Sequence, residues 1–214
     1  MAVTLQKGQG VSLKKAENNL STVTIGLGWD IQEQKKSLFG GLLGGKTADY
    51  DLDVAAFLCD ITGKVKNLGR DERGQATLRN SDVIFFNNQR HASGHIWLTG
   101  DNRTGAGDGD DEQIIVKLND LSDTKFYKVV FVVQIYKGSE NRQHFGQVKN
   151  AFIRAVDASG KEMVRYDLSG VGEYENQRSL LFAELVREST GWKFNAIGAS
   201  SPSDSFVEWL KHYA

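Results

Sequence analysis

The chain has 214 residues, of which 40% are hydrophobic and 25% charged, an ordinary composition for a globular protein with a sizeable core. Its net charge of −1 at pH 7, without a cluster of basic residues, argues against a nucleic-acid-binding surface, because neutralising phosphates requires concentrated Lys and Arg. The single cysteine, Cys59, excludes an intramolecular disulfide and a thiolate zinc cluster, and it agrees with a reducing compartment.

The first ten residues, MAVTLQKGQG, are too polar for a signal peptide, and no stretch approaches the roughly 20 apolar residues that span a bilayer. We therefore expect a cytoplasmic protein that is not an integral membrane protein. The sequence has one proline and no long linker rich in Ser, Gly or Pro. It therefore predicts a single domain over residues 1–214.

Strand patterns dominate the chain, because apolar residues alternate with polar ones or run in short blocks rich in Val, Ile, Phe, Tyr and Trp. Nine strands without long helices between them predict an all-β fold, an antiparallel β-sandwich of two packed sheets. The nine clearest segments are residues 21–30, 51–60, 81–88, 111–120, 125–136, 150–158, 161–169, 179–188 and 192–198.

Turns and short helices complete the expected fold. Tight turns are expected at 60–63, 157–160 and 189–191, each of which ends in the glycine that such turns favour. Short helices are expected only near 145–149 and in the C-terminal segment SDSFVEWLKHYA at 203–214, where Ser205 and Glu208 fit a capping box.

The segment GDNRTGAGDGDDE at 100–112 holds five carboxylates and one arginine in an otherwise almost neutral chain. It lies between the strand patterns GHIWLT and EQIIVKL, so we expect a loop at one end of the sandwich. Closely packed carboxylates repel one another unless a cation lies among them. Calcium suits such a loop, since it takes about six to eight oxygen ligands in flexible geometry, whereas magnesium requires a stricter octahedron.

A solvated acidic turn is the alternative, and most runs of charge are solvated turns. Two features favour the metal site. The last three acids directly precede a buried-type strand, and glycines at 105, 107 and 109 free the backbone so that its carbonyls can turn inward. The twelve residues 101–112 do not form an EF-hand, because Arg103, Gly105 and Ala106 occupy the third, fifth and sixth positions and no helices flank them.

Acids from two other segments are expected at the same end of the sandwich. Asp30 closes the first expected strand, and Asp51 and Asp53 open the second, where alternation places them on one face with Ala55. For Asp53, a structural hydrogen-bond acceptor is an equal alternative. The predicted metal ligands are Asp30, Asp51, Asp53, Asp101, Asn102, Asp108, Asp110, Asp111 and Glu112.

Several sequence blocks resemble successive parts of the TerD family of bacterial tellurium-resistance and general stress proteins. These blocks are LGWD (27–30), DLD (51–53), FFNN (85–88), SGHIWLTGDNRTGAGDGDDE (93–112), HFGQVKNAFIRAVD (144–157) and AELVRESTGWKFNAIG (183–198). The resemblance implies a β-sandwich that binds two calcium ions at its acidic end. It also implies a cytoplasmic stress role beside other tellurium-resistance and stress proteins, without an established catalytic activity.

An enzyme is the competing hypothesis, in the form of a metal-assisted hydrolase that uses the same carboxylates. Other catalytic groups have less support. Cys59 lies in an apolar strand pattern typical of an inert core thiol. His91 and His95 are spaced as in a helical zinc site, but Gly94 and the following strand argue against a helix. We therefore predict a non-catalytic binding or scaffold protein.

The segment SLFGGLLGG at 37–45 leaves two interpretations open. Its leucines and phenylalanine fold over the end of the sandwich, or they dip into a membrane surface or dock on a partner. In the membrane interpretation, bound calcium bridges the acidic loops to anionic lipid, and the protein is peripheral to the inner face of the membrane.

Overall fold

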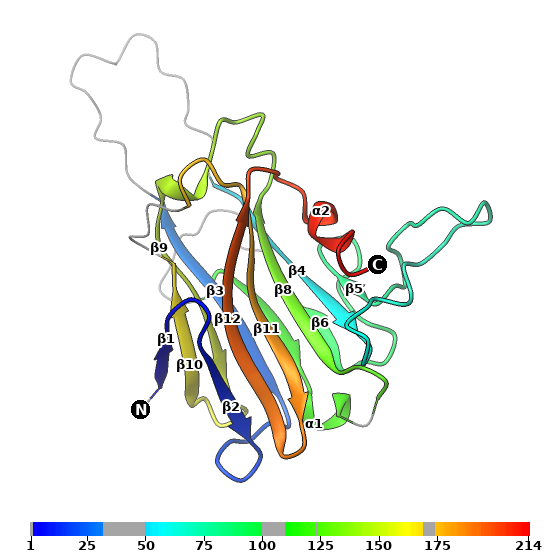
Figure 1. Cartoon of the computed structure of the whole chain (residues 1–214), viewed down its shortest axis with the longest axis vertical. Helices are drawn as coiled ribbons and strands as arrows, with labels where there is room; N and C mark the ends of the chain where they lie inside the picture. Colours follow the sequence, from blue (N-terminus) through cyan, green and yellow to red (C-terminus); the bar gives the residue numbers. More distant parts are fainter. Residues whose placement is uncertain (1, 32–49, 100–109, 123, 169–173) are drawn as a thin grey trace.

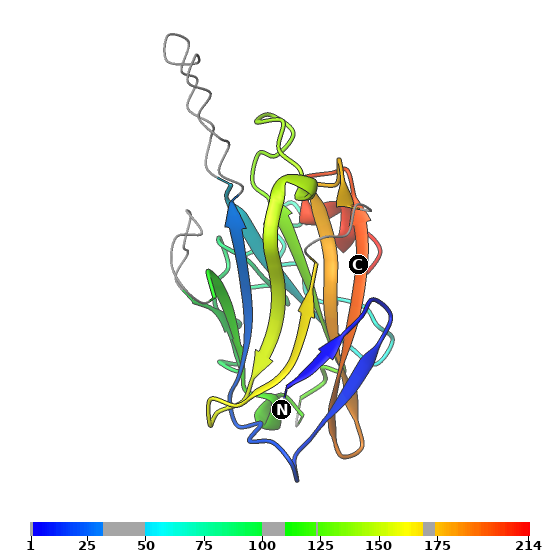
Figure 2. The same cartoon turned by 90° about the vertical axis from the view of Figure 1, so that its left-hand side faces the viewer.

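The computed structural model describes residues 2–31, 50–99, 110–122, 124–168 and 174–214. Two six-stranded sheets form the two layers of a sandwich, as Figures 1 and 2 show from perpendicular directions. The strands are β1 (Val3–Leu5), β2 (Gly10–Lys14), β3 (Val23–Ile31), β4 (Leu52–Cys59), β5 (Val83–Ile84), β6 (Ile96–Leu98), β7 (Glu112–Val116), β8 (Lys128–Ile135), β9 (Val148–Val156), β10 (Glu162–Asp167), β11 (Ser179–Glu188) and β12 (Gly191–Ser201). The helices are α1 (Leu118–Leu121), the 3-10 turn η1 (Phe145–Gln147) and α2 (Phe206–Leu210). The predicted all-β sandwich is confirmed.

The order of strands is β1-β10-β9-β3-β7-β6 in the first sheet and β2-β12-β11-β8-β4-β5 in the second sheet. The pairings between neighbours are antiparallel except for β1 with β10, which is parallel. Hairpins β9–β10 and β11–β12 close at the expected turns near 157–160 and 189–191. Gly160 has φ +82°, so its lack of a Cβ is required there.

Alternation along the strands builds the core between the sheets. In β3, Ile25 and Leu27 are buried toward the second sheet, while the intervening Gly26 lies on the outer face. From the second sheet, Phe131 and Phe182 join the same apolar cluster. Side chains from both inner faces therefore fill one core, as in other sandwiches.

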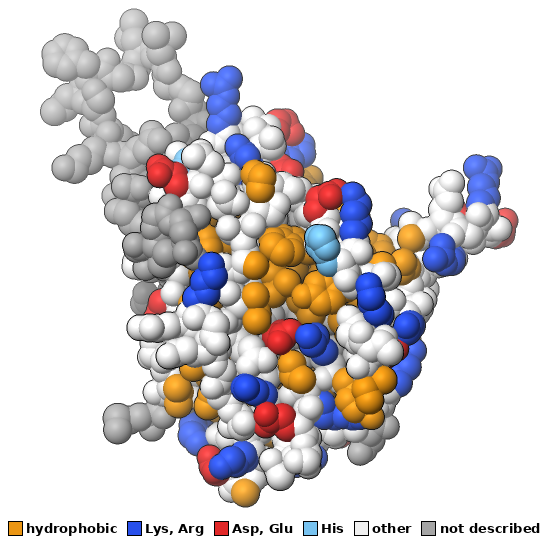
Figure 3. Space-filling view, viewed as in Figure 1, with side chains coloured by type: hydrophobic (Ala, Val, Ile, Leu, Met, Phe, Trp, Pro, Cys, Tyr) orange, Lys and Arg blue, Asp and Glu red, His pale blue; other side chains and the backbone are white. Residues whose placement is uncertain are grey.

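A second apolar cluster covers the outer face of the second sheet. Phe206 of α2 packs there with its ring centroid 5.2 Å from that of Phe85 and 6.2 Å from that of Phe57. Figure 3 shows apolar side chains gathered on this face beside α2, where Ile197 and Trp209 are partly buried. The C-terminal helix is thus a packed element of the fold.

The N-terminus of α2 agrees in part with the expected capping box. The Ser205 side chain accepts a hydrogen bond from the N–H of Val207, as an N-cap residue does. The carboxylate of Glu208 instead pairs with Lys211 at 2.7 Å, one turn along the helix. The helix is confirmed, and only the serine contributes its half of the capping box.

The structure differs from the predicted elements at four places. Strands β1 and β2 were not expected, and the segment 111–120 divides into β7 and the short helix α1. The predicted strand at 81–88 is reduced to the two residues of β5, which a turn follows. The loop 37–45 lies outside the described residues, so neither interpretation of it is tested. No helix among the described residues has the length and apolar character needed to cross a membrane.

Candidate metal centre

The predicted acidic residues 110–112 lie where β3, β4 and β7 adjoin. Strand β7 pairs with β3 in a register that sets Glu112 opposite Leu27. The Asp111 amide donates to the Leu27 carbonyl at 2.8 Å, and the Glu112 carboxylate accepts the Val54 N–H from β4 of the other sheet at 2.8 Å. The register of β7 therefore brings residues 110–112 to the junction of the two sheets.

Asp111 and Glu112 are buried carboxylates, with 6% and 3% of their surface exposed. Oδ2 of Asp111 accepts the backbone N–H of Trp29 at 2.9 Å, just as Glu112 accepts that of Val54. Burying a carboxylate costs several kcal/mol, and hydrogen bonds to a charged group, each worth about 1.5–3 kcal/mol, offset that cost. Two buried carboxylates that are adjacent in sequence make this junction the candidate position for a cation.

Asp110 already has a cationic partner within the protein. Its carboxylate lies on the outer face of the first sheet directly over Gly26, where an added Cβ would stand 2.1 Å from Asp110 Oδ2. Nε of Arg154 donates to Asp110 Oδ1 at 2.8 Å, and Nη1 of Arg154 donates to Glu162 Oε2 at 3.0 Å. The hydrogen bond to Asp110, ahead of smaller effects, raises the pKa of Arg154. This ion pair sets Asp110 apart from the two acids that follow it.

Of the remaining predicted ligands, the structure describes the side chains of Asp51 and Asp53 only. Asp53 shares its face of β4 with Ala55, as expected, and this face points toward α2 and away from the first sheet. Oδ2 of Asp53 accepts a hydrogen bond from Nε2 of Gln134 at 3.4 Å. Asp51, next to the start of β4, accepts the N–H of Tyr136 through its backbone carbonyl at 2.8 Å. The side chain of Asp30 and all of Asp101, Asn102 and Asp108 lie outside the described residues.

The described part of this site fits a hard cation in its donor chemistry, because it offers buried carboxylate oxygens and no sulfur. Within the described ranges, however, no group of three or more His, Cys, Asp or Glu side chains is arranged to hold a metal. A complete coordination sphere would need ligands from residues 100–109 in addition to Asp111 and Glu112.

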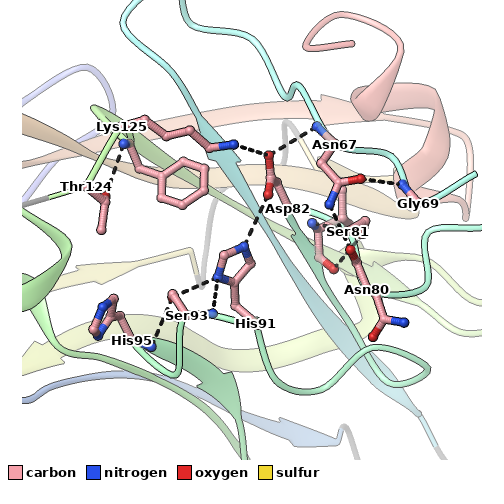
Figure 4. Close-up of polar contacts among 12 residues, drawn as sticks. Asn67, Gly69, Asn80, Ser81, Asp82, His91, Ser93, His95, Thr124 and Lys125 are labelled. Carbon is pink, nitrogen blue, oxygen red and sulfur yellow. Dashed lines mark hydrogen bonds and ion pairs between the residues drawn. The ribbon is translucent and has the colours of Figure 1, made fainter.

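A second polar cluster, which the sequence did not indicate as a unit, surrounds His91 (Figure 4). Its Nε2 lies 3.2 Å from Oδ1 of the buried Asp82, and its Nδ1 lies 2.8 Å from Oγ of Ser93. The other oxygen of Asp82 accepts the Asn67 N–H at 3.1 Å and lies 3.8 Å from Nζ of Lys125. The partners resemble a Ser-His-Asp triad in type.

The local backbone argues against catalysis by this cluster. The amide of Ser93 donates to Nδ1 of His91, that of Gly94 to the His91 carbonyl, and that of His95 to Oγ of Ser93. All three amides are therefore used inside the turn and cannot form an oxyanion hole. His95 faces Asp120 at 3.7 Å, so His91 and His95 have separate partners. The cluster is best explained as a structural contact that holds the turn at residues 91–95 against Asp82.

Cys59 is fully buried in the second apolar cluster. Burial is the main reason that the pKa of its thiol is raised to about 12, with smaller effects from nearby charges. A thiolate is therefore scarce at neutral pH, which agrees with the expected inert core thiol.

Comparison with known proteins identifies the family. Residues 1–213 match the TerD domain. The chain is 64% identical over 213 residues to the tellurium resistance protein TerX of Serratia marcescens, and 36% identical over 214 residues to the stress response protein SCP2 of Bacillus subtilis (strain 168), in each case covering 100% of both chains.

A solved structure has the same fold. The crystal structure of a homologue of the telluride resistance protein TerD from Streptomyces coelicolor A3(2) matches with a TM-score of 0.60 at 21% identity, covering 92% of this chain and 99% of that one. At this identity the likeness concerns the fold alone. Because the domain match extends over residues 1–213 and these relatives align along their full length, the chain belongs to the TerD family of tellurium-resistance and stress proteins.

Proposed function

We propose that this protein is a calcium-binding member of the stress response of the tellurium-resistance type, and that it acts as a non-catalytic binding or scaffold module. The observation that carries the proposal is the pair of buried carboxylates, Asp111 and Glu112, at the base of the acidic segment 100–112. Their burial favours a bound cation, and their all-oxygen chemistry favours calcium. The family supports the stress role.

The proposed ligands are Asp111 and Glu112 together with Asp101, Asn102 and Asp108 of the same segment, and Asp30, Asp51 and Asp53 from the neighbouring strands. Two calcium ions would divide these donors between them. Asp110, whose Oδ1 pairs with Arg154, also belongs to the proposed ligand set. Bound calcium would neutralise the clustered charge and hold the loops at this end in a single arrangement.

Direct binding of tellurite at this end is disfavoured by its charge. Tellurite is an oxyanion, and the carboxylates would repel it unless calcium first supplied positive charge. A calcium-dependent surface that recruits other stress proteins in the cytoplasm, or at the inner face of the membrane, agrees better with the acidic site.

Isosteric substitutions test the ligand assignment without removing the backbone contacts. Asp111→Asn and Glu112→Gln each keep an oxygen that can accept the N–H of Trp29 or Val54, but each loses a negative charge. Both are expected to weaken calcium binding at least about tenfold, measured by calorimetry on chelator-stripped protein. Glu17→Gln is the matched control, because Glu17 is exposed in the turn that precedes the opposite end of β3.

The outcomes separate the calcium module from its competitors. Unchanged calcium affinity in both variants would contradict the ligand assignment. Turnover of a phosphate or carboxylate ester that disappears in Asp111→Asn, while the fold persists, would instead support the metal-assisted hydrolase. The proposed module predicts calcium binding without such turnover.

A further inference from the structure

An open cavity of about 350 Å³ lies between the turn after β4, the start of β8 and the end of β11. It is at the opposite end of the sandwich from Glu112, which contacts β4 near the start of that strand. Binding sites for small molecules have volumes of about 300–1,000 Å³ and combine apolar walls with a few polar groups. The size of this cavity therefore suits a small ligand.

Part of the cavity wall is apolar, because Ile61, Tyr127 and Val186 line it. Ile61 is 72% exposed, the highest value among the exposed large apolar residues of the described chain. Its turn has a fixed shape, since Oδ1 of Asp60 accepts the Thr62 hydroxyl at 2.6 Å and the Thr62 N–H at 2.9 Å. A ligand with an apolar body would remove the surface of Ile61 from water, which favours binding.

The ionic groups on the wall leave one positive charge without an acidic partner. Oδ2 of Asp60 lies 3.5 Å from Nζ of Lys66, and Nζ of Lys128 lies 2.9 Å from a carboxylate oxygen of Glu184. Among the residues that the structure describes, no Asp or Glu pairs with Arg187, the third ionic group of the wall. The cavity therefore has an excess of one positive charge, which favours an anion.

Arg187 is held in one orientation by uncharged partners. Its guanidinium carbon lies 3.4 Å from the centroid of the Tyr127 ring, and Nη1 donates to the carbonyls of Ser122 at 2.6 Å and Thr124 at 3.1 Å. Within the described ranges, neither Nε nor Nη2 donates to a protein acceptor. A guanidinium in this state is oriented in advance and can donate two parallel hydrogen bonds to a carboxylate.

We propose that this cavity binds a small organic monocarboxylate, with the carboxylate on Arg187 and the apolar body against Ile61 and Val186. A single negative charge matches the single excess positive charge, while the nearby Asp60 disfavours a second negative charge on the ligand. The cavity shares no residue with the proposed calcium ligands, so the carboxylate binds with or without calcium.

Titration of the full chain with hexanoate, followed by NMR at the backbone amides of Ile61, Gly63 and Arg187, tests the site. Saturable shifts are expected with a dissociation constant of about 1 mM or lower. Hexan-1-ol has a similar apolar body without the charge, and sulfate has charge without an apolar body. Each of these two probes is expected to bind at least about tenfold more weakly than hexanoate.

Two variants assign the interaction to the proposed residues. Arg187→Gln removes the charge and keeps a side-chain amide that can donate to the Ser122 carbonyl, and it is expected to weaken hexanoate binding at least about tenfold. Ile61→Asp places a repelling charge on an exposed side chain, so it keeps the fold even if Arg187→Gln does not, and a loss of about fivefold is expected. Val3→Asp, at an exposed apolar position on β1 of the other sheet, is the matched control and is expected to bind as the wild type does.

Three results would overturn the carboxylate site. The first is the absence of saturable shifts at these amides up to about 10 mM hexanoate. The second is binding of hexan-1-ol or sulfate as tight as that of hexanoate, which would remove the role of Arg187 or that of the apolar wall. The third is unchanged hexanoate affinity in both Arg187→Gln and Ile61→Asp.

Discussion

At the scale of single residues, the absence of a side chain at Gly26 creates the position that Asp110 occupies. The carboxylate lies where a Cβ would stand, and Arg154 holds it there. Gly26→Ala is expected to displace Asp110 and to lower the free energy of unfolding by about 1–3 kcal/mol, measured by urea denaturation. Thr24→Ala, on the same face of β3, is the control.

A double variant identifies the cause of this loss. Adding Asp110→Ala to Gly26→Ala removes the overlapping carboxylate, so stability is expected to recover in part. If Gly26→Ala alone is as stable as the wild type, the Asp110 carboxylate does not lie directly over Gly26.

The thiol of Cys59 gives a second prediction at this scale. Because burial raises its pKa to about 12 and leaves no exposed surface, a thiol reagent at pH 8 is expected to label it only in denaturant. Counting modified thiols by mass spectrometry, with and without urea, checks this. Rapid labelling of the native protein would show that the second apolar cluster opens readily.

The sequence identified which carboxylates are unusual but not how each one is used. Asp110, Asp111 and Glu112 are adjacent and chemically alike, yet Asp110 lies on the outer face of the first sheet, while Glu112 contacts the second sheet. The difference depends on Arg154, which is 44 residues away in sequence and is brought close by the pairing of β9 with β3. Long-range register of this kind cannot be obtained from spacing along one chain.

At the scale of elements, the long strands could be predicted because each carries a full alternating or apolar pattern. Strands β1 and β2 are short and largely exposed at the edges of their sheets, so they lack that pattern. Segment 111–120 appeared continuous because Leu118 extends the apolar pattern of β7, whereas in the structure it is the fully buried first residue of α1. Tertiary packing overrides the local pattern there.

The turn after β4 makes stability depend on pH. Oδ1 of Asp60 accepts hydrogen bonds from the Thr62 hydroxyl at 2.6 Å, the Thr62 N–H at 2.9 Å and the Lys64 N–H at 3.2 Å. Chiefly through the Thr62 hydroxyl, the pKa of Asp60 falls from 3.8 to about 2. Because the folded pKa is depressed, the contribution is present above the unfolded pKa and is lost as pH falls through the folded one.

Comparison of the wild type with Asp60→Asn tests this dependence. The difference in unfolding free energy between the two proteins is expected to be constant above about pH 5 and to shrink between pH 3.8 and about 2. Urea denaturation at a series of pH values measures it. A difference that stays constant down to pH 2 would contradict the assigned role of Asp60.

At the scale of the whole molecule, the acidic end is a place where the two sheets are joined by a charged side chain. Glu112 belongs to β7 of the first sheet and binds the backbone of β4 in the second. A cation held there would contact ligands from both layers, so its binding should stabilise the sandwich as a unit. Calcium binding would therefore be linked to global stability.

The most direct test of the central claim is the unfolding free energy of chelator-stripped protein, measured with and without calcium and repeated with magnesium. At a calcium concentration about a hundredfold above its dissociation constant, we expect a gain of about 2.7 kcal/mol for each bound ion and a much smaller effect of magnesium. Stability that is unchanged by calcium would contradict the calcium centre and would leave segment 100–112 as a solvated acidic turn on a TerD fold.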